Sequence, residues 1–235
     1  MTKRTNPVKT KGPALEYSRA LRKVAAHVGE LVRAFPDPSD PRLAEALLKY
    51  SEALDGWARV VAQKMLAAVA HRDIKAWREI TKGMSLALRN EIENAPTGQA
   101  MRGLMADQVH LIKSLPLDAA QRVHNLVIQG QGSTRAAEIA KEIMRTSEVT
   151  KSRATLIALT ETSRAATAMT QARAEHIGSE GYVWRTAKDS HVRESHKRMQ
   201  GRFVRWDSPP TLDNMTGHAG CLPRCRCYPE VVIGE

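Results

Sequence analysis

Three cysteines and one histidine near the end of the sequence are the side chains best suited to chemistry. Cys221, Cys225 and Cys227 lie within seven positions of one another, and His196 precedes them. Zinc prefers four ligands in a tetrahedron, drawn from thiolates and imidazoles. We therefore predict a structural zinc site made of His196, Cys221, Cys225 and Cys227.

The fourth ligand of this predicted site is open, because His191 and His218 are alternatives to Cys221. The spacing Cys-x-x-x-Cys-x-Cys also differs from the Cys-x-x-Cys of common zinc modules. The competing interpretation has three reduced, buried cysteines and a histidine that is hydrogen-bonded in the core. A disulfide is disfavoured in a reducing cytoplasm.

A second group of polar side chains lies between the histidine and the preceding aromatic run. If residues 189–199 are helical, then Asp189, Arg193 and His196 occur at i, i+4 and i+7 and project from one face. Such a face is typical of a scaffold, with Asp189 paired to Arg193. We therefore predict no catalytic residues.

The alternative interpretation of this region is a nucleic-acid-cleaving enzyme, either metal-dependent or RNase-like. His191, Arg193 and His196 supply the residue types for a general acid, a general base and a phosphate-binding cation. A metalloprotease is excluded by spacing, because the two histidines are five positions apart and the protease motif needs four.

The elements that must position these residues are mostly helices. Alanine and long unbranched residues are frequent and aromatic residues make up only 4%, which favours helix over strand. Asp40 followed by Pro41 is a good helix start. Apolar spacing predicts helices over 14–33, from 41 to about 71, from Asp73 to about 92, over 99–114, from Asp118 to about 129, and over 149–177.

The fold class expected is mainly α with a small α+β C-terminal domain. After Gly181 the spacing becomes irregular, and we predict a strand at Tyr182–Trp184, a short helix, a Pro-rich loop and a closing strand near 228–233. The predicted divisions are a flexible basic arm (1–13), a helical N-terminal region (14–115), a helical part of the C-terminal half (116–181) and an α+β C-terminal module (182–235).

Basic residues are concentrated in two stretches. The formal net charge is +11; residues 1–35 carry eight Lys/Arg against two acidic residues, and residues 185–227 carry nine against four. Such stretches attract a polyanion through phosphate neutralisation and counterion release. We predict contact with double-stranded DNA through Lys3, Arg4, Lys9 and Lys11, the cations of the arm.

The sequence excludes two other classes of protein. Its first 13 residues are charged and turn-forming, which is not a secretory signal. It also has no run of about 18 apolar residues, so we expect no membrane contact and synthesis in the cytoplasm.

Three ordered segments resemble the Mu F-like head-morphogenesis proteins, the minor capsid family of tailed phages. The first is Arg153-Ala-x-x-Ile157-Ala-x-Thr160-Glu161-Thr162 in the predicted long helix. The second is Trp184-x-Thr-x-x-Asp189-x-x-Val-Arg193-x-x-His196, followed by Gly201. The third is Cys225-Arg226-Cys227. The resemblance covers about 115–233, and Cys221 is an additional cysteine beside the usual pair.

This resemblance implies a virion component rather than an enzyme. It implies action in procapsid assembly near the portal and in DNA packaging or ejection, with the portal protein, the major capsid or scaffolding protein and DNA as partners. The expected location is the capsid interior or portal vertex, reached from the host cytoplasm. Glu161, Trp184, Asp189, Arg193, Gly201 and Arg226 are then structural motif residues.

Overall fold

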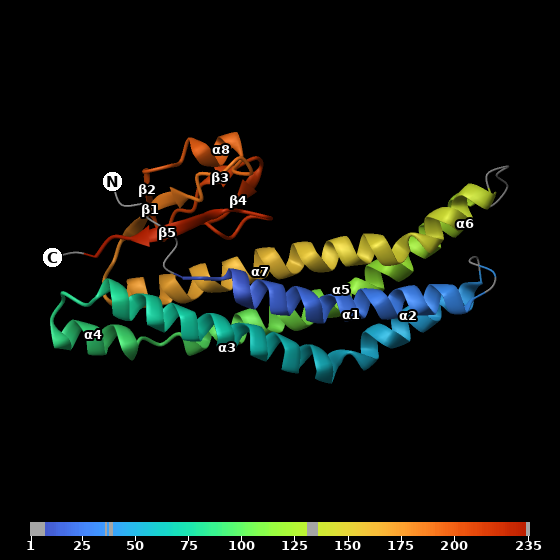
Figure 1. Cartoon of the computed structure of the whole chain (residues 1–235), viewed down its shortest axis with the longest axis horizontal. Helices are drawn as coiled ribbons and strands as arrows, with labels where there is room; N and C mark the ends of the chain where they lie inside the picture. Colours follow the sequence, from blue (N-terminus) through green and yellow to red (C-terminus); the bar gives the residue numbers. More distant parts are fainter. Residues whose placement is uncertain (1–7, 36, 38–39, 131–135, 234–235) are drawn as a thin grey trace. The chain divides into compact units, whose positions relative to one another are not determined.

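The chain is mainly α-helical and carries a small antiparallel sheet near its C-terminal end. A computed structural model describes residues 8–35, 37, 40–130 and 136–233. Figure 1 shows its helices α1 (Lys11–Ala34), α2 (Pro41–Ala53), α3 (Asp55–Ile80), α4 (Leu86–Glu93), α5 (Gly98–Gly130), α6 (Ala136–Met144), α7 (Thr146–His176) and α8 (Glu194–Lys197). The strands are β1 (Gly181–Thr186), β2 (Phe203–Arg205), β3 (Thr211–Leu212), β4 (Met215–Thr216) and β5 (Cys227–Val231). The predicted fold class is confirmed.

The described chain forms two compact units, and several long helices contribute to both. Among the described residues, the helical unit comprises 15–35, 37, 40–63, 105–130 and 136–158, and the sheet-bearing unit comprises 8–14, 64–104 and 159–233. These bounds differ from the predicted divisions, because α5 runs without a break across 115/116. The helix α1 also begins at Lys11, so the last three residues of the predicted arm are helical.

The core of the helical unit is aliphatic. Its buried side chains recur every three or four residues along α1, α2 and α5, as expected for helices that bury one face, and α6 contributes Ile143. Asp40 caps α2 by accepting a hydrogen bond from the backbone N–H of Arg42, at 2.9 Å, and Pro41 follows it. This confirms the predicted helix start. The core residues are Val28, Val32, Leu43, Leu47, Ala119, Ala120, Val123 and Ile143.

Pro116 lies inside α5, where the sequence predicted a break. Proline inside a helix removes one backbone hydrogen bond and costs about 3 kcal/mol. Hydroxyl groups bond to carbonyls just before it: Ser114 donates to the carbonyl of Leu111 and Ser51 donates to that of Lys113, both at 2.9 Å. Leu115 is buried just before the proline, and Ala119 and Ala120 are buried one turn after it. This burial favours one continuous helix, so the predicted break was wrong.

The sheet of the sheet-bearing unit has the strand order β2-β1-β5, all antiparallel. In this register Trp184 lies opposite Pro229 and Thr186 lies opposite Cys227. Side chains alternate along β1, so Tyr182, Trp184 and Thr186 share the buried face. Cys227 is therefore delivered to the same face as the large aromatic residues.

Aromatic side chains dominate the core beneath this sheet. It contains three of the four tryptophans of the chain, together with one tyrosine and small residues. The buried members are Trp77, Ile92, Ala174, Tyr182, Trp184, Val204, Trp206, Ala219 and Cys227. The strands β3 and β4 form a separate hairpin, whose turn residues Asp213 and Asn214 have positive φ values of 52° and 62°. That conformation suits a tight hairpin turn.

Asp73 does not begin a helix, as the sequence predicted, but lies inside α3 with its side chain fully buried. Its carboxylate accepts a hydrogen bond from Arg173 Nε at 2.8 Å and another from the Thr170 hydroxyl at 2.9 Å. Arg173 also donates to the carbonyl of Ile92 at 2.6 Å. An aspartate looks like a capping residue in a sequence, but here a distant arginine keeps it inside the helix. This buried ion pair joins α3, α4 and α7.

Candidate metal centre

The segment that carries His196 is a turn followed by one short helix, and the predicted helix over 189–199 was wrong. The helix α8 begins only at Glu194. Before it, Asp189 accepts a hydrogen bond from the backbone N–H of His191 at 3.0 Å, and Lys188 has a positive φ of 54°. An aspartate that bonds to the backbone two residues later stabilises a turn in competition with a helix.

The predicted pair between Asp189 and Arg193 is also wrong, because each has another partner. The carboxylate of Asp189 pairs with Arg226 Nη2 at 2.6 Å. The side chain of Arg193 instead reaches Asp213 at 3.7 Å. Asp189 therefore holds the strand-like Cys-Arg-Cys segment beside the turn, and Arg193 belongs to a different contact.

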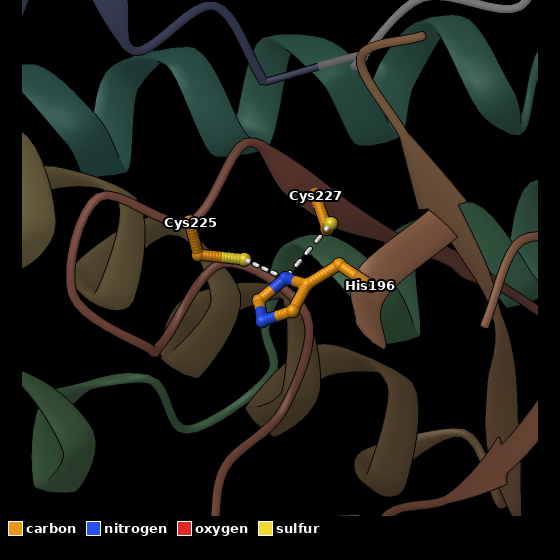
Figure 2. A group of neighbouring side chains, drawn as sticks. All are labelled: His196, Cys225 and Cys227. Atoms are coloured by element: carbon orange, nitrogen blue, oxygen red, sulfur yellow. Dashed lines mark hydrogen bonds between the residues drawn. The ribbon is translucent and has the colours of Figure 1, made fainter. Parts of the chain in front are cut away.

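The imidazole of His196 faces two thiols, as Figure 2 shows. Its Nδ1 lies 3.4 Å from Cys225 Sγ and 3.5 Å from Cys227 Sγ. One ligand atom from each of the three residues lies within 4.8 Å of the other two. His196 and Cys227 are buried, and Cys225 is partly buried. The structure thus brings together three of the four residues predicted to bind zinc.

These distances suit a tetrahedral metal. With zinc–sulfur bonds of about 2.3 Å and zinc–nitrogen bonds of about 2.0–2.1 Å, a tetrahedron separates nitrogen from sulfur by about 3.6 Å. The observed separations of 3.4 and 3.5 Å lie close to that value. Two thiols and an imidazole are also the donors that zinc prefers. The cluster is therefore able to hold a metal ion.

The electrostatics of the pair favour one thiolate and one thiol. Hydrogen bonds from the Cys227 thiol, from His196 and from the backbone N–H of Gly220 lower the pKa of Cys225 to about 4. The hydrogen bond to Cys225 and burial together raise the pKa of Cys227. A metal that binds both sulfurs must therefore displace one thiol proton, as metal binding to cysteines commonly does.

Cys221 lies outside this group of three. It is partly buried, and burial raises the pKa of its thiol to about 12. Of the alternatives for the fourth ligand, His191 is exposed at the surface, and His218 packs against the rings of Tyr182 and Trp206. The described residues thus supply three converging ligands.

Arg193 holds the loop of residues 218–227, here called the Cys loop, against α8. Its guanidinium contacts the ring of His196 at Nε2, 3.4 Å away, and donates to the backbone carbonyl of Pro223 within the loop. Arginine only donates, so a hydrogen bond here requires a free lone pair on Nε2, which places the ring proton on Nδ1, facing the thiols. A metal at Nδ1 would shift that proton to Nε2. The guanidinium of Arg193 would then keep its contacts with the Asp213 carboxylate and the Pro223 carbonyl.

Two other motif residues close the same region. Gly201 has a φ of 83° in the turn after α8, and its backbone N–H donates to the carbonyl of Trp184 at 2.9 Å. The ring of Trp184 meets the ring of His196 edge-on, with centroids 5.7 Å apart. Glu161 is buried on α7 and paired with Arg164 at 3.5 Å. The predicted motif residues therefore take part in several separate contacts and do not share one helix face.

Hydroxyl contacts to the Cys loop were missed from the sequence. Thr167 donates to the carbonyl of Ala219 at 2.8 Å, and Thr160 accepts from the backbone N–H of Arg224 at 3.1 Å. The hydroxyl of Tyr182 accepts from the N–H of Ala219 at 3.1 Å. The available signal was the spacing of polar residues along α7, which recur every three or four positions from Thr160 to Thr170.

The two histidines of the nuclease interpretation lie in different environments. The side chain of His191 is 75% exposed, whereas His196 is 2% exposed. Both ring nitrogens of His196 face protein groups, namely the thiols and Arg193. His196 is therefore placed to hold a structure together rather than to reach a phosphate in solvent.

The predicted DNA contacts fall partly outside the described residues. Lys3 and Arg4 are not described, whereas Lys9 and Lys11 are exposed. Four exposed cations of the second basic stretch, Lys188, Arg198, Arg202 and Arg224, form no ion pair within the described part of the chain. Among the described helices, none has the length and apolar character that crossing a membrane requires.

The fold and the cluster together define a mainly helical protein whose small C-terminal α+β module carries a Cys/His centre. The sequence pattern of the family described as "Phage Mu protein F like protein" matches residues 120–229. This segment spans α7, the sheet and the three clustered ligands. The match confirms the predicted resemblance, and the chain carries a Mu F-like phage protein region.

A relative comes from Haemophilus influenzae (strain Rd) and bears the name "Uncharacterized protein". It is 30% identical over 199 residues, which cover 81% of this chain. The chain spans 44% of the length of that relative. No solved structure matches the chain.

Proposed function

We propose that this chain is a minor capsid protein that acts in head morphogenesis of a tailed bacteriophage. It works in procapsid assembly near the portal and in DNA packaging or ejection. Its partners are the portal protein, the major capsid or scaffolding protein and double-stranded DNA. Its place is the capsid interior or portal vertex, after synthesis in the host cytoplasm. The observation that carries this proposal is the Mu F-like match over residues 120–229.

The direct test removes the gene from the phage or prophage that encodes it. Procapsids and mature heads are then counted by electron microscopy, and purified heads are analysed for the chain by mass spectrometry. We expect the chain in wild-type heads, and fewer DNA-filled infectious particles without it. Normal yields from the deletion, together with absence of the chain from wild-type heads, would overturn the proposal.

The DNA contact follows from exposed cations at both ends of the chain. On duplex DNA, each neutralised phosphate contributes about 0.9 to the slope of log affinity against log salt. We expect a shallower slope when Lys3, Arg4, Lys9 and Lys11 are replaced by glutamine. The same replacement at Lys188, Arg198, Arg202 and Arg224 serves as the comparison. An unchanged slope in both variants would exclude DNA binding through these residues.

We propose further that the metal held by His196, Cys225 and Cys227 is zinc in a structural role. The support is the donor set and the nitrogen–sulfur separations of 3.4 and 3.5 Å. Bound zinc would neutralise the buried thiolates and fix the Cys loop against α8. Elemental analysis of protein purified without added metal tests this directly. We expect about one zinc per chain for a single structural site, and a ratio near zero removes the proposal.

The alternative enzyme interpretation is less well supported, because His196 is buried against the thiols. It is tested by incubating the purified chain with plasmid and RNA, with and without a chelator. We expect no cleavage. Cleavage that is lost in His196→Ala would replace the structural proposal with an enzymatic one.

A further inference from the structure

The indole N–H of Trp184 has no hydrogen-bond partner among the described residues, although the side chain is fully buried. Native proteins rarely leave a buried donor without a partner, because its desolvation is then uncompensated. Trp184 lies in the middle strand of the sheet, at the centre of the aromatic core. The orphaned donor therefore needs an explanation.

The sulfur of Cys227 is the candidate hydrogen-bond acceptor for this indole N–H. Trp184 and Cys227 lie on the same buried face, since Cys227 is paired with Thr186, two residues along β1 from Trp184. The indole also meets the ring of His196 edge-on. Trp184 and Cys227 belong to the same buried core cluster, and diagonal neighbours on one face of a sheet lie within reach of a long aromatic side chain. The indole N–H forms no hydrogen bond with this sulfur among the described residues.

The other sulfur of the cluster already has such a donor. The backbone N–H of Gly220 donates to Cys225 Sγ at 3.4 Å. A metal binds cysteine as the thiolate, and a thiolate is a better hydrogen-bond acceptor than a thiol. Metal binding therefore makes Cys227 a better acceptor. The indole N–H then gains an acceptor where the metal-free chain offers it only a thiol.

We propose that Trp184 is a positioning residue of the metal centre, whose indole N–H donates to the metal-bound thiolate of Cys227. This inference rests on the proposed metal site. The metal-bound centre then has one N–H donor for each sulfur, from Gly220 for Cys225 and from Trp184 for Cys227. Such hydrogen bonds around metal ligands typically change metal affinity by about 10- to 100-fold.

Trp206 provides a matched control within the same core. It is also buried, and its indole N–H also lacks a partner in the described part of the chain. Its ring packs against Tyr182 and His218, whereas the ring of Trp184 packs against His196. Replacing either tryptophan with phenylalanine removes the same group from the same core. Only Trp184→Phe should change the affinity of the chain for the metal.

The experiment measures zinc affinity of the full chain by competition with a chromophoric chelator. We expect Trp184→Phe to weaken zinc binding by about 10- to 100-fold and Trp206→Phe to leave it unchanged. With cobalt in place of zinc, the sulfur-to-cobalt charge-transfer band should shift in Trp184→Phe alone. Thermal melts of the metal-free protein should show Trp184→Phe as stable as Trp206→Phe, because neither replacement removes a formed hydrogen bond.

The outcomes separate this inference from the site on which it rests. Stoichiometric zinc binding by the wild type, with equal affinities and cobalt spectra for the two variants, overturns the role of Trp184 and leaves the metal site standing. A Trp184→Phe protein that is destabilised without metal as much as with it also overturns the inference, because the role would then be packing. Absence of zinc binding by the wild type refutes both proposals.

Discussion

In the helical unit, the buried core consists of aliphatic side chains that recur along helices, such as Val28, Leu43 and Leu47. In the sheet-bearing unit, the core is built from Trp77, Tyr182, Trp184 and Trp206, and a sulfur of the metal cluster is part of it. The first core is held by non-directional burial. The second depends on directed contacts between segments far apart in the chain. Removing single polar groups should therefore damage the two units very differently.

The largest difference should come from the clustered ligands. Structural zinc contributes about 10–16 kcal/mol of binding free energy in small zinc domains. If the proposed zinc is bound, replacing His196 with alanine, or both Cys225 and Cys227 with serine, should remove that contribution from the C-terminal module. We expect hydrogen–deuterium exchange to lose protection over residues 182–233 and to keep it over the helical unit.

Cys221→Ser is the control for this prediction, since Cys221 lies outside the group of three ligands. It should retain metal and protection of the module. If Cys221→Ser abolished metal binding as completely as His196→Ala, Cys221 would have to be a ligand. Equal loss of protection in both units would mean that they do not differ in their dependence on the cluster.

The buried ion pair of the sheet-bearing unit should give the next largest effect. Asp73→Ala leaves the guanidinium of Arg173 buried without its carboxylate, and such a change costs about 3–5 kcal/mol. Chemical denaturation monitored by tryptophan fluorescence measures this change. The double variant Asp73→Leu/Arg173→Met should recover most of the stability, because it removes both buried charges. A double variant as unstable as Asp73→Ala would contradict this reasoning.

Truncation in the aliphatic core tests the other side of the comparison. Leu47 is fully buried, and Leu47→Ala should cost about 2–5 kcal/mol through reduced burial and the remaining cavity. Because this core holds no metal ligand among its described residues, zinc affinity should stay at the wild-type value. A large fall in zinc affinity would show that the cluster depends on the helical unit.

The same contrast explains what the sequence predicted. Helices with periodic apolar residues were found within a few positions, as for α1 and α7, because each buries one face and the pattern repeats along the chain. The proximity of His196, Cys225 and Cys227 was predicted because thiols and an imidazole so close in sequence are typical of one site, whereas Cys221, predicted with them, lies outside the group. In both cases the local sequence was enough, because periodic apolar residues indicate a helix and closely spaced thiols indicate a possible metal site.

What the sequence could not predict depends on partners elsewhere in the chain. Asp73 resembles a helix cap until Arg173, a hundred positions away, is placed beside it. Asp189 and Arg193 match a helical pair, but the Asp189 carboxylate bonds to the backbone and to Arg226. In each case local spacing was compatible with two structures, and a distant residue decided between them.

The smallest prediction compares one hydroxyl from each unit. Ser51 donates to the carbonyl of Lys113 in the helical unit, and Thr167 donates to that of Ala219 in the Cys loop. Ser51→Ala and Thr167→Val should each lower the free energy of unfolding by about 1 kcal/mol, the typical net value of one hydrogen bond. Only Thr167→Val should also weaken zinc binding, because it releases the Cys loop from α7. Equal zinc affinities in the two variants would mean that the loop is held well enough by its other contacts, and that a single directed bond matters no more there than in the aliphatic unit.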